Sequence, residues 1–256
     1  MLAKERQDKI YKMLLRDGAV TVSDLVAQFQ VSIETVRRDL LNMEQRGLLS
    51  RVHGGAVVKQ DMKPFYDLQR RNAEFGSEKL ALSRKAAQFV SEGDVIGIDM
   101  GSTANYFADA LKERFSRLTV VTYSYDVFVR LCNHKDFSVI LCGGHYDKEE
   151  KTFYGALAIE MLKLLHVSKA FIFPSAVSLE YGIGDYQEGV YSLQKHLIHS
   201  AEDVFILADS SKFEKRALLK LSDMNSAYTY ITDGNLSNEL SRLYSENHIT
   251  ICKGEK

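Results

Sequence analysis

The stretch TVSDLVAQFQVSIETVRRDL, residues 21–40, decides the fold of the N-terminal region. Thr21 and Asp24 have the spacing of a capping box, in which polar side chains satisfy free N–H groups at the start of a helix. Ser32 can cap a second helix in the same way, because its hydroxyl accepts from N–H groups in the first helical turn. The stretch therefore predicts two short helices joined by a tight turn.

The second of these helices has two chemically different sides. One side is predicted to face the core and carries Ile33, Val36, Leu40 and Met43 at a helical period. The other side carries Glu34, Arg37 and Arg38, with Thr35 on its flank. A helix fits the major groove of DNA, where arginine can bind guanine and threonine can contact the methyl group of thymine. The pattern indicates a DNA-reading helix.

The flanking segments extend this motif to a winged helix-turn-helix. Apolar periodicity predicts a helix from Ala3 to Arg16, which Gly18 ends. Residues 48–58, LLSRVHGGAVV, alternate around two glycines, which is typical of a two-stranded wing. We expect Arg51 and His53 of this wing to lie near DNA phosphates. The alternative is a charged helix face that only keeps the protein dissolved.

The charge of the chain is unevenly distributed. Residues 1–60 contain ten Lys and Arg and seven Asp and Glu, so their net charge is +3 and that of the other 196 residues is −4. A basic N-terminal region fits contact with a polyanion. The sequence contains no apolar run near the roughly 18 residues of a membrane span, and its polar N-terminus is unlike a signal peptide. Three scattered cysteines favour reduced thiols in the cytoplasm.

The rest of the chain predicts a larger α/β domain. We expect a winged helix-turn-helix domain over residues 1–58, a linker over 59–75 and an effector-sensing domain over 76–256. Short apolar runs alternate with helical segments, which indicates a mainly parallel sheet with helices on both faces. The predicted strands are Val95–Ile98, Leu118–Val121, Val139–Leu141, Ala170–Phe173, Val204–Leu207 and Tyr228–Ile231. The predicted helices between them are Ala104–Arg114, Asp126–Cys132, Ala156–Leu165, Val190–Ser200 and Asn238–Asn247, and Met161, Leu162, Leu164 and Leu165 are assigned to the core.

Polar and glycine residues follow several of these strands. Ligands of open parallel sheets bind at the carboxyl ends of the strands. The candidate residues there are Asp99, Gly101, Ser102, Thr103, Thr122, Ser124, Gly143, Gly144, Asp209 and Lys212. A helix start at Gly101 offers N–H groups to an anion, Lys212 adds a positive charge, and carboxylates suit sugar hydroxyl groups. The residues predict a site for a small, hydroxylated, phosphorylated ligand, although tight turns and helix caps would use the same residue types.

The motifs VSIETVRRDL, GLLSRVHGGAV, DMGST and DSSK, with the glycines of CGGH, resemble those of the DeoR-type bacterial transcription regulators. The resemblance covers nearly the whole chain. It implies a sensor domain related to ribose-5-phosphate isomerase and glucosamine-6-phosphate deaminase. It also implies repression of a sugar operon under control of a phosphorylated sugar. Met100, Tyr123 and Pro174-Ser175 depart from the usual family pattern.

Other functions are less well supported by the sequence. Cys142 and His145 have a short metal-binding spacing, but no paired C-x-x-C accompanies them, so we expect neither a metal nor a cofactor. Nucleotide-binding and esterase motifs are absent from the sequence. The competing hypothesis is a sugar-phosphate isomerase or deaminase, with Asp99, Asp209 or Glu188 as base. We expect instead a regulator that binds an operator in double-stranded DNA as a homodimer or homotetramer.

Overall fold

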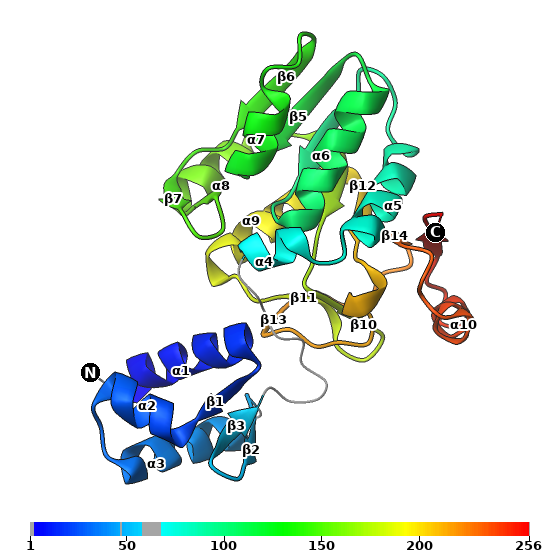
Figure 1. Ribbon diagram of the computed structural model, residues 1–256. Helices are drawn as coiled ribbons and strands as arrows, with labels where there is room; N and C mark the ends of the chain where they lie inside the picture. The colour runs from blue at the N-terminus through cyan, green and yellow to red at the C-terminus, as the bar shows by residue number, and fades with distance from the viewer. Residues whose placement is uncertain (1–2, 47, 58–67, 256) are drawn as a thin grey trace. The chain divides into compact units, whose positions relative to one another are not determined.

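The computed structural model describes residues 3–46, 48–57 and 68–255 (Figure 1). Its contacts divide the chain into two units, Met1–Asp67 and Leu68–Lys256, which we call the head and the body. Residues 59–67 of the predicted linker lie outside the described residues. The remainder of that segment includes helix α4, Leu68–Ala73, which belongs to the body.

The head contains three helices and a small antiparallel sheet (Figure 1). Its elements are α1 Ala3–Asp17, β1 Ala19–Thr21, α2 Val22–Phe29, α3 Ile33–Gln45, β2 Ser50–Val52 and β3 Gly55–Val57. The strand order β1-β3-β2 shows that the wing is widened by β1, a strand that the sequence pattern did not predict. The predicted winged helix-turn-helix is confirmed.

Local hydrogen bonds explain where the head's helices begin. The hydroxyl of Thr21 accepts from the backbone N–H of Asp24 at 3.1 Å, and the hydroxyl of Ser32 accepts from that of Thr35 at 3.2 Å. Both predicted caps are therefore confirmed. Gln30 ends α2 in the left-handed conformation, with φ of 51°, and this residue turns the chain between the two helices.

One core assignment in the head is wrong. Val36, Leu40 and Met43 are buried as predicted, but the side chain of Ile33 is 51% exposed. Ile33 is the first residue of α3, so it lies beyond the end of the face that packs on the core. Periodicity alone cannot show where a packed face stops.

A glycine allows the wing to pack closely. A Cβ atom at Gly55 would lie 2.1 Å from the carbonyl oxygen of Val20, because β1 and β3 are paired at this point. Glycine removes this clash, so the HGG sequence of the wing has a packing function as well as a turn function.

The body is built around a seven-stranded sheet in which every neighbouring pair is parallel, in the order β15-β14-β12-β9-β4-β5-β6. These strands are β4 Val95–Ile98, β5 Leu118–Thr122, β6 Phe137–Leu141, β9 Val167–Ile172, β12 Ala201–Leu207, β14 Thr229–Thr232 and β15 Ile251–Lys253. The helices are α4, α5 Gly76–Ala87, α6 Ser102–Arg114, α7 Tyr125–Leu131, α8 Ala156–Lys163, α9 Glu188–His199, the 3₁₀ turn η1 Ser210–Lys212 and α10 Asn238–Glu246. The predicted α/β fold with a parallel sheet is confirmed.

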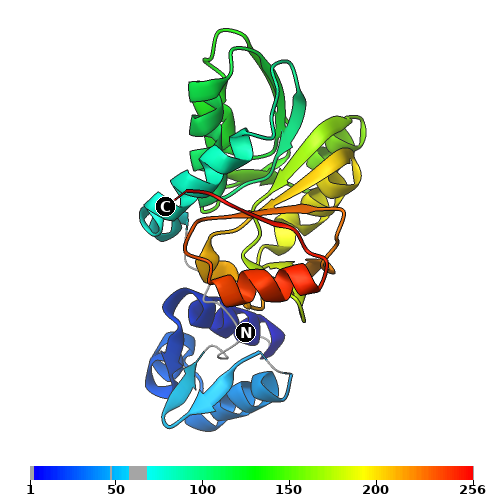
Figure 2. The same ribbon diagram turned by 90° about the vertical axis from the view of Figure 1, so that its right-hand side faces the viewer.

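Each face of the sheet has its own hydrophobic core. Residues of α5, α6 and α7 pack on one face, and residues of α8, α9 and α10 pack on the other. Figure 2 shows the green helices α6 and α7 and the yellow helix α9 on opposite sides of the strands. Strand β12 serves both cores, since Ile206 faces one and Phe205 and Leu207 face the other. This two-sided burial explains the continuous apolar runs in the sequence.

Short strands and one helix face depart from the predictions. β15, the hairpin of β7 His145–Asp147 with β8 Thr152–Tyr154, and the sheet of β10 Ala176–Ser178, β11 Gly182–Asp185 and β13 Leu219–Ser222 were not predicted. These strands have only three or four residues, too few for a clear pattern. On α8, Leu162 is buried as predicted, whereas Met161 is 38% exposed and Leu164, just after α8, is 82% exposed.

No helix in the described part of the chain is both long enough and apolar enough to cross a membrane.

Candidate DNA-binding surface and effector site

The exposed face of α3 carries the residues that the sequence assigned to DNA. Arg37 donates from Nη1 to the Glu34 carboxylate at 3.1 Å, with both side chains well exposed. Arg38 is exposed as well, and Thr35 is half-buried beside the Ser32 cap. Because Glu34 pairs with Arg37, it can orient that guanidinium along the helix surface. The arrangement presents two cations from the first two turns of α3.

A buried ion pair fixes the position of α3 in the head. Arg6 of α1 donates from Nε to the Asp39 carboxylate at 2.5 Å, and Gln7 donates to the same carboxylate at 2.9 Å. The side chains of Arg6 and Asp39 are 8% and 5% exposed. No local pattern singles out Asp39, because its partners lie 32 and 33 residues away. This contact fastens α3 to α1.

The wing presents its predicted residues at the surface. Arg51 and His53 are exposed, and the backbone N–H of Arg51 donates to the Glu44 carboxylate at 2.8 Å, which joins the wing to α3. Gly54 has φ of 81°, so glycine suits this turn of the hairpin. Arg51 and His53 are thus held on a short, tightly turned hairpin.

The predicted effector residues follow four strands of the parallel sheet. Because β12, β9, β4, β5 and β6 are consecutive and parallel, their carboxyl ends lie at one edge of the sheet. Asp99 and Gly101 follow β4, Ser124 follows β5, Gly143 follows β6 and Asp209 follows β12. The structure therefore brings these residues to the same edge.

Asp99 is held by protein donors. Its carboxylate accepts from the Tyr123 hydroxyl, from the backbone N–H of Phe173 at 3.1 Å and from the Gln194 amide at 3.1 Å. The side chain is fully buried, and this burial raises the pKa of Asp99 to about 6 against the opposing effect of the Tyr123 hydrogen bond. Tyr123, which departs from the family pattern, thus supplies one of the donors. Asp99 therefore joins the segments that follow β4, β5 and β9 to α9.

Asp209 and Lys212 lie at the 3₁₀ turn after β12. Asp209 caps this turn by accepting from the backbone N–H of Ser211 at 3.1 Å. The Lys212 ammonium donates to the Pro174 carbonyl at 2.9 Å and lies 4.0 Å from the Asp209 carboxylate. Burial lowers the pKa of Lys212. The lysine is therefore a largely buried cation beside the ends of β9 and β12.

The start of α6 has the features of an anion site. Gly101 is the N-cap with φ of 117°, a conformation that favours glycine, and Ser102 and Thr103 form the first turn. N–H groups at a helix start attract anions, and the helix dipole adds to this effect. The Thr103 hydroxyl is buried and, among the described residues, has no hydrogen-bond partner. A bound polar group would satisfy it.

The other predicted residues have structural contacts at the same edge. The Thr122 hydroxyl accepts from the backbone N–H of Ser124 at 3.0 Å, and Ser124 caps α7. A Cβ atom at Gly144 would lie 2.4 Å from the Tyr154 carbonyl oxygen, so this glycine lets the chain pass close to β8. Gly143 has open space around its Cα.

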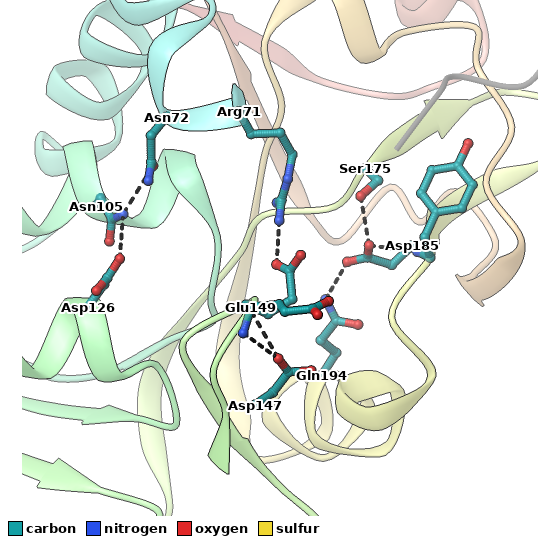
Figure 3. Close-up of polar contacts among 11 residues, drawn as sticks. Arg71, Asn72, Asn105, Asp126, Asp147, Glu149, Ser175, Asp185 and Gln194 are labelled. Atoms are coloured by element: carbon teal, nitrogen blue, oxygen red, sulfur yellow. Dashed lines mark hydrogen bonds and ion pairs between the residues drawn. The ribbon is translucent and has the colours of Figure 1, made fainter. Parts of the chain in front are cut away.

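Four residues at this edge were not identified from the sequence, and Figure 3 labels three of them, Arg71, Asp185 and Gln194. Arg71 of α4 pairs with Glu150, which lies between β7 and β8. Asp185 accepts from the Ser175 hydroxyl and from the Gln194 amide, both at 2.7 Å. Because the Gln194 amide N–H groups serve Asp99 and Asp185, its carbonyl oxygen is left as a buried acceptor without a partner among the described residues. None of the four lies in a recognisable local motif.

Metal ligation has little support in the described part of the chain. No group of three or more His, Cys, Asp or Glu able to hold a metal ion occurs there. Cys142 is buried directly after β6, and burial raises the pKa of its thiol to about 11. A thiol in that state behaves as a small apolar side chain.

Comparisons with known proteins agree with the two units. A model of the DeoR-like helix-turn-helix domain matches residues 6–61, and a model of the DeoR C terminal sensor domain matches residues 74–234. The chain belongs to the DeoR family of transcriptional regulators. This DeoR-family protein therefore has a DNA-binding helix-turn-helix and a sensor domain for an effector.

Several relatives that match this chain over nearly their whole length are transcriptional regulators. The chain is 34% identical to an uncharacterized HTH-type transcriptional regulator of Bacillus subtilis, over 92% of this chain and 91% of that protein. It is 33% identical to the L-fucose operon activator of Haemophilus influenzae, over 95% and 96%. It is 32% identical to the lactose phosphotransferase system repressor of Lactococcus lactis subsp. lactis, over the full length of both. These relatives are named as transcriptional regulators and not as enzymes, in agreement with the family of this chain.

A solved structure of ribose 5-phosphate isomerase A from Neisseria gonorrhoeae also matches, with a TM-score of 0.41 and 21% identity over 54% of this chain and 53% of the isomerase.

Proposed function

We propose that this DeoR-family protein represses a sugar-metabolism operon and is controlled by a phosphorylated sugar bound at the edge of the sheet. The observation that carries the proposal is the start of α6 at Gly101 with its buried Thr103 hydroxyl, together with buried carboxylates and Lys212 at the same edge. N–H groups suit a phosphate, and carboxylates suit sugar hydroxyls. The names of the lactose and L-fucose relatives agree with a carbohydrate signal, and those two proteins are a repressor and an activator.

The proposed effector site contains the residues that line up at this edge. Its binding groups are Asp99, Gly101, Ser102, Thr103, Thr122, Ser124, Gly143, Gly144, Asp209 and Lys212. Asp99 and Asp209 already accept hydrogen bonds from the protein, so each would bind a sugar hydroxyl through a remaining lone pair or by exchanging a partner.

The proposed DNA contacts lie on α3 and on the wing. They are Ser32, Glu34, Thr35, Arg37, Arg38, Arg51 and His53. One head reads few bases, so two heads of a homodimer or homotetramer would bind repeated half-sites. Effector binding would then change the arrangement of the heads, and a coupling of about 1–3 kcal/mol is usual for such regulation.

The test of DNA recognition begins with selection of genomic fragments that the purified protein retains. Arg38→Ala is then compared with Lys12→Ala, which removes one exposed positive charge from α1. Loss of a base contact costs about 1–3 kcal/mol, so Arg38→Ala should weaken binding about 5- to 150-fold. The Lys12 variant should lose much less. Equal affinities for the two variants would rule out α3 as the reading helix.

The test of the effector is a thermal-shift screen of sugar phosphates against their unphosphorylated sugars. A ligand that binds only the native state raises the melting temperature. The proposal requires that at least one phosphorylated member raises it and that the matching free sugar does not. A response to free sugars alone would reject the phosphate requirement.

A further inference from the structure

Arg71, in the first helix of the body, lies close to the start of α6. A Cβ atom at Gly101 would be 3.7 Å from Nη1 of Arg71, so the guanidinium lies over the turn that begins α6. Figure 3 shows the side chain extending from α4 toward the hairpin of β7 and β8. A guanidinium at the start of a helix adds a full positive charge to N–H groups that already favour anions.

Glu150 supplies the negative charge that pairs with this guanidinium. Its carboxylate forms an ion pair with Nη2 of Arg71, and the two side chains are 5% and 19% exposed. The backbone N–H of Glu150 donates to the Asp147 carboxylate at 3.1 Å, which holds the hairpin turn. Burial raises the pKa of Glu150, while the charge of Arg71 acts in the opposite direction. A carboxylate removed from water in this way depends on its cation for compensation.

We propose that Glu150 is an internal substitute for the ligand's phosphate. It pairs with Arg71 in the absence of ligand, and a phosphate group that binds at the start of α6 replaces it as the partner of the guanidinium. This inference rests on the proposed effector site. A phosphate carries about −1.5 to −2 charges near pH 7, against −1 for a carboxylate, and arginine binds it through two parallel hydrogen bonds. A phosphate at this point would also receive the N–H groups of Ser102 and Thr103 and satisfy the buried Thr103 hydroxyl.

A change of partner at Arg71 would affect α4, the first helix of the body. Helix α4 is fastened to its neighbours by polar contacts. The Lys79 ammonium donates to the carbonyl oxygens of Arg71 and Glu74. The Asn105 amide donates to the Asn72 side chain at 3.3 Å, as Figure 3 shows. Because α4 is the first helix of the body, a change of partner at Arg71 would act on the element that follows the head in the chain. The ligand then has different contacts in two states, as regulation requires.

The decisive experiment measures binding of inorganic phosphate to the full-length protein at constant ionic strength. In Glu150→Gln the internal competitor loses its charge, so phosphate should bind more tightly by at least about 5-fold, the lower end of ordinary coupling. Arg71→Gln should lose phosphate binding. Glu149→Gln removes the same charge from the neighbouring exposed residue and should leave the dissociation constant unchanged.

The outcomes separate this inference from the proposed function. If the wild type binds phosphate and Glu150→Gln binds it equally or less well, the internal substitute is rejected and the effector site stands. If neither protein binds phosphate, both are rejected. Binding by Glu150→Gln alone supports both.

A measurement on the wild type covers the case in which Glu150→Gln does not fold. Hydrogen exchange of the α4 amides is followed with and without saturating phosphate. Release of Arg71 from Glu150 should change their protection, whereas unchanged protection would overturn the inference.

Discussion

Replacement of Asp39 by alanine tests how the head holds its reading helix. The Asp39 carboxylate is buried between Arg6 and Gln7 of α1, with contacts of 2.5 and 2.9 Å. Alanine removes the negative charge and leaves the Arg6 guanidinium inside the head, where its side chain is 8% exposed. Breaking a buried ion pair in this way costs about 3–5 kcal/mol, since an uncompensated charge remains.

This cost is large for a small unit. Domains are stable by only about 5–15 kcal/mol, and each kcal/mol shifts the melting temperature of a domain of 60–100 residues by about 4–8 °C. The head of Asp39→Ala should therefore unfold at least about 10 °C below that of the wild type. Operator binding should be lost in parallel, because Arg37 and Arg38 are on the same helix.

The assay follows hydrogen exchange of head peptides within the full-length protein as the temperature rises. Glu34→Ala is the matched control, since Glu34 is an acidic residue of α3 in a pair with Arg37 whose side chains are 77% and 61% exposed. Such surface pairs contribute about 0–1 kcal/mol. If Asp39→Ala destabilised the head no more than Glu34→Ala does, the structural importance of the buried pair would be refuted.

Three further predictions concern Gly55 in the wing, and Asp99 and Lys212 in the proposed effector site. Gly55→Ala should destabilise the head by about 1–3 kcal/mol, because its Cβ would meet the Val20 carbonyl at 2.1 Å; Gly143→Ala, with open space around it, should be nearly neutral in the same thermal melts. The pKa of Asp99 is raised to about 6, so over part of the pH range the folded protein binds a proton that the unfolded chain has lost. The free energy of unfolding should therefore fall as the pH rises from about 4 to 6, by a total that approaches about 3 kcal/mol. Thermal melts across this pH range should show no such dependence for Asp99→Asn. Lys212→Ala should leave operator affinity unchanged yet abolish the response to phosphorylated sugars in a gel-shift titration, and a normal response would remove Lys212 from the site.

Much of the fold follows from local patterns in the sequence. The strands β4, β5 and β12 were found because each is a continuous apolar run that is buried on both sides. Thr21 and Ser32 were found because a cap needs only its own first turn. The three- and four-residue strands were missed because tertiary pairing, and not local preference, creates them.

Part of the candidate site was predictable because local patterns locate the strands that it follows. Gly101 and Lys212 follow strands, and strand ends can be inferred once the strands are known. Arg71 and Glu150 meet across 79 residues of sequence, and Gln194 joins Asp99 across 95. No pattern within one segment could indicate such contacts. Ile33 was wrongly assigned to the core, because the helical period of apolar residues continues beyond the part of α3 that is packed.

The central claim is that one ligand, bound at the edge of the sheet, controls the affinity of the head for DNA. Fluorescence anisotropy of a selected operator fragment, titrated with the protein in the presence and absence of the sugar phosphate that raises its melting temperature most, tests it directly. We predict a change in operator affinity of at least about 5-fold. A sugar phosphate that stabilises the protein and yet leaves operator affinity the same would contradict the account.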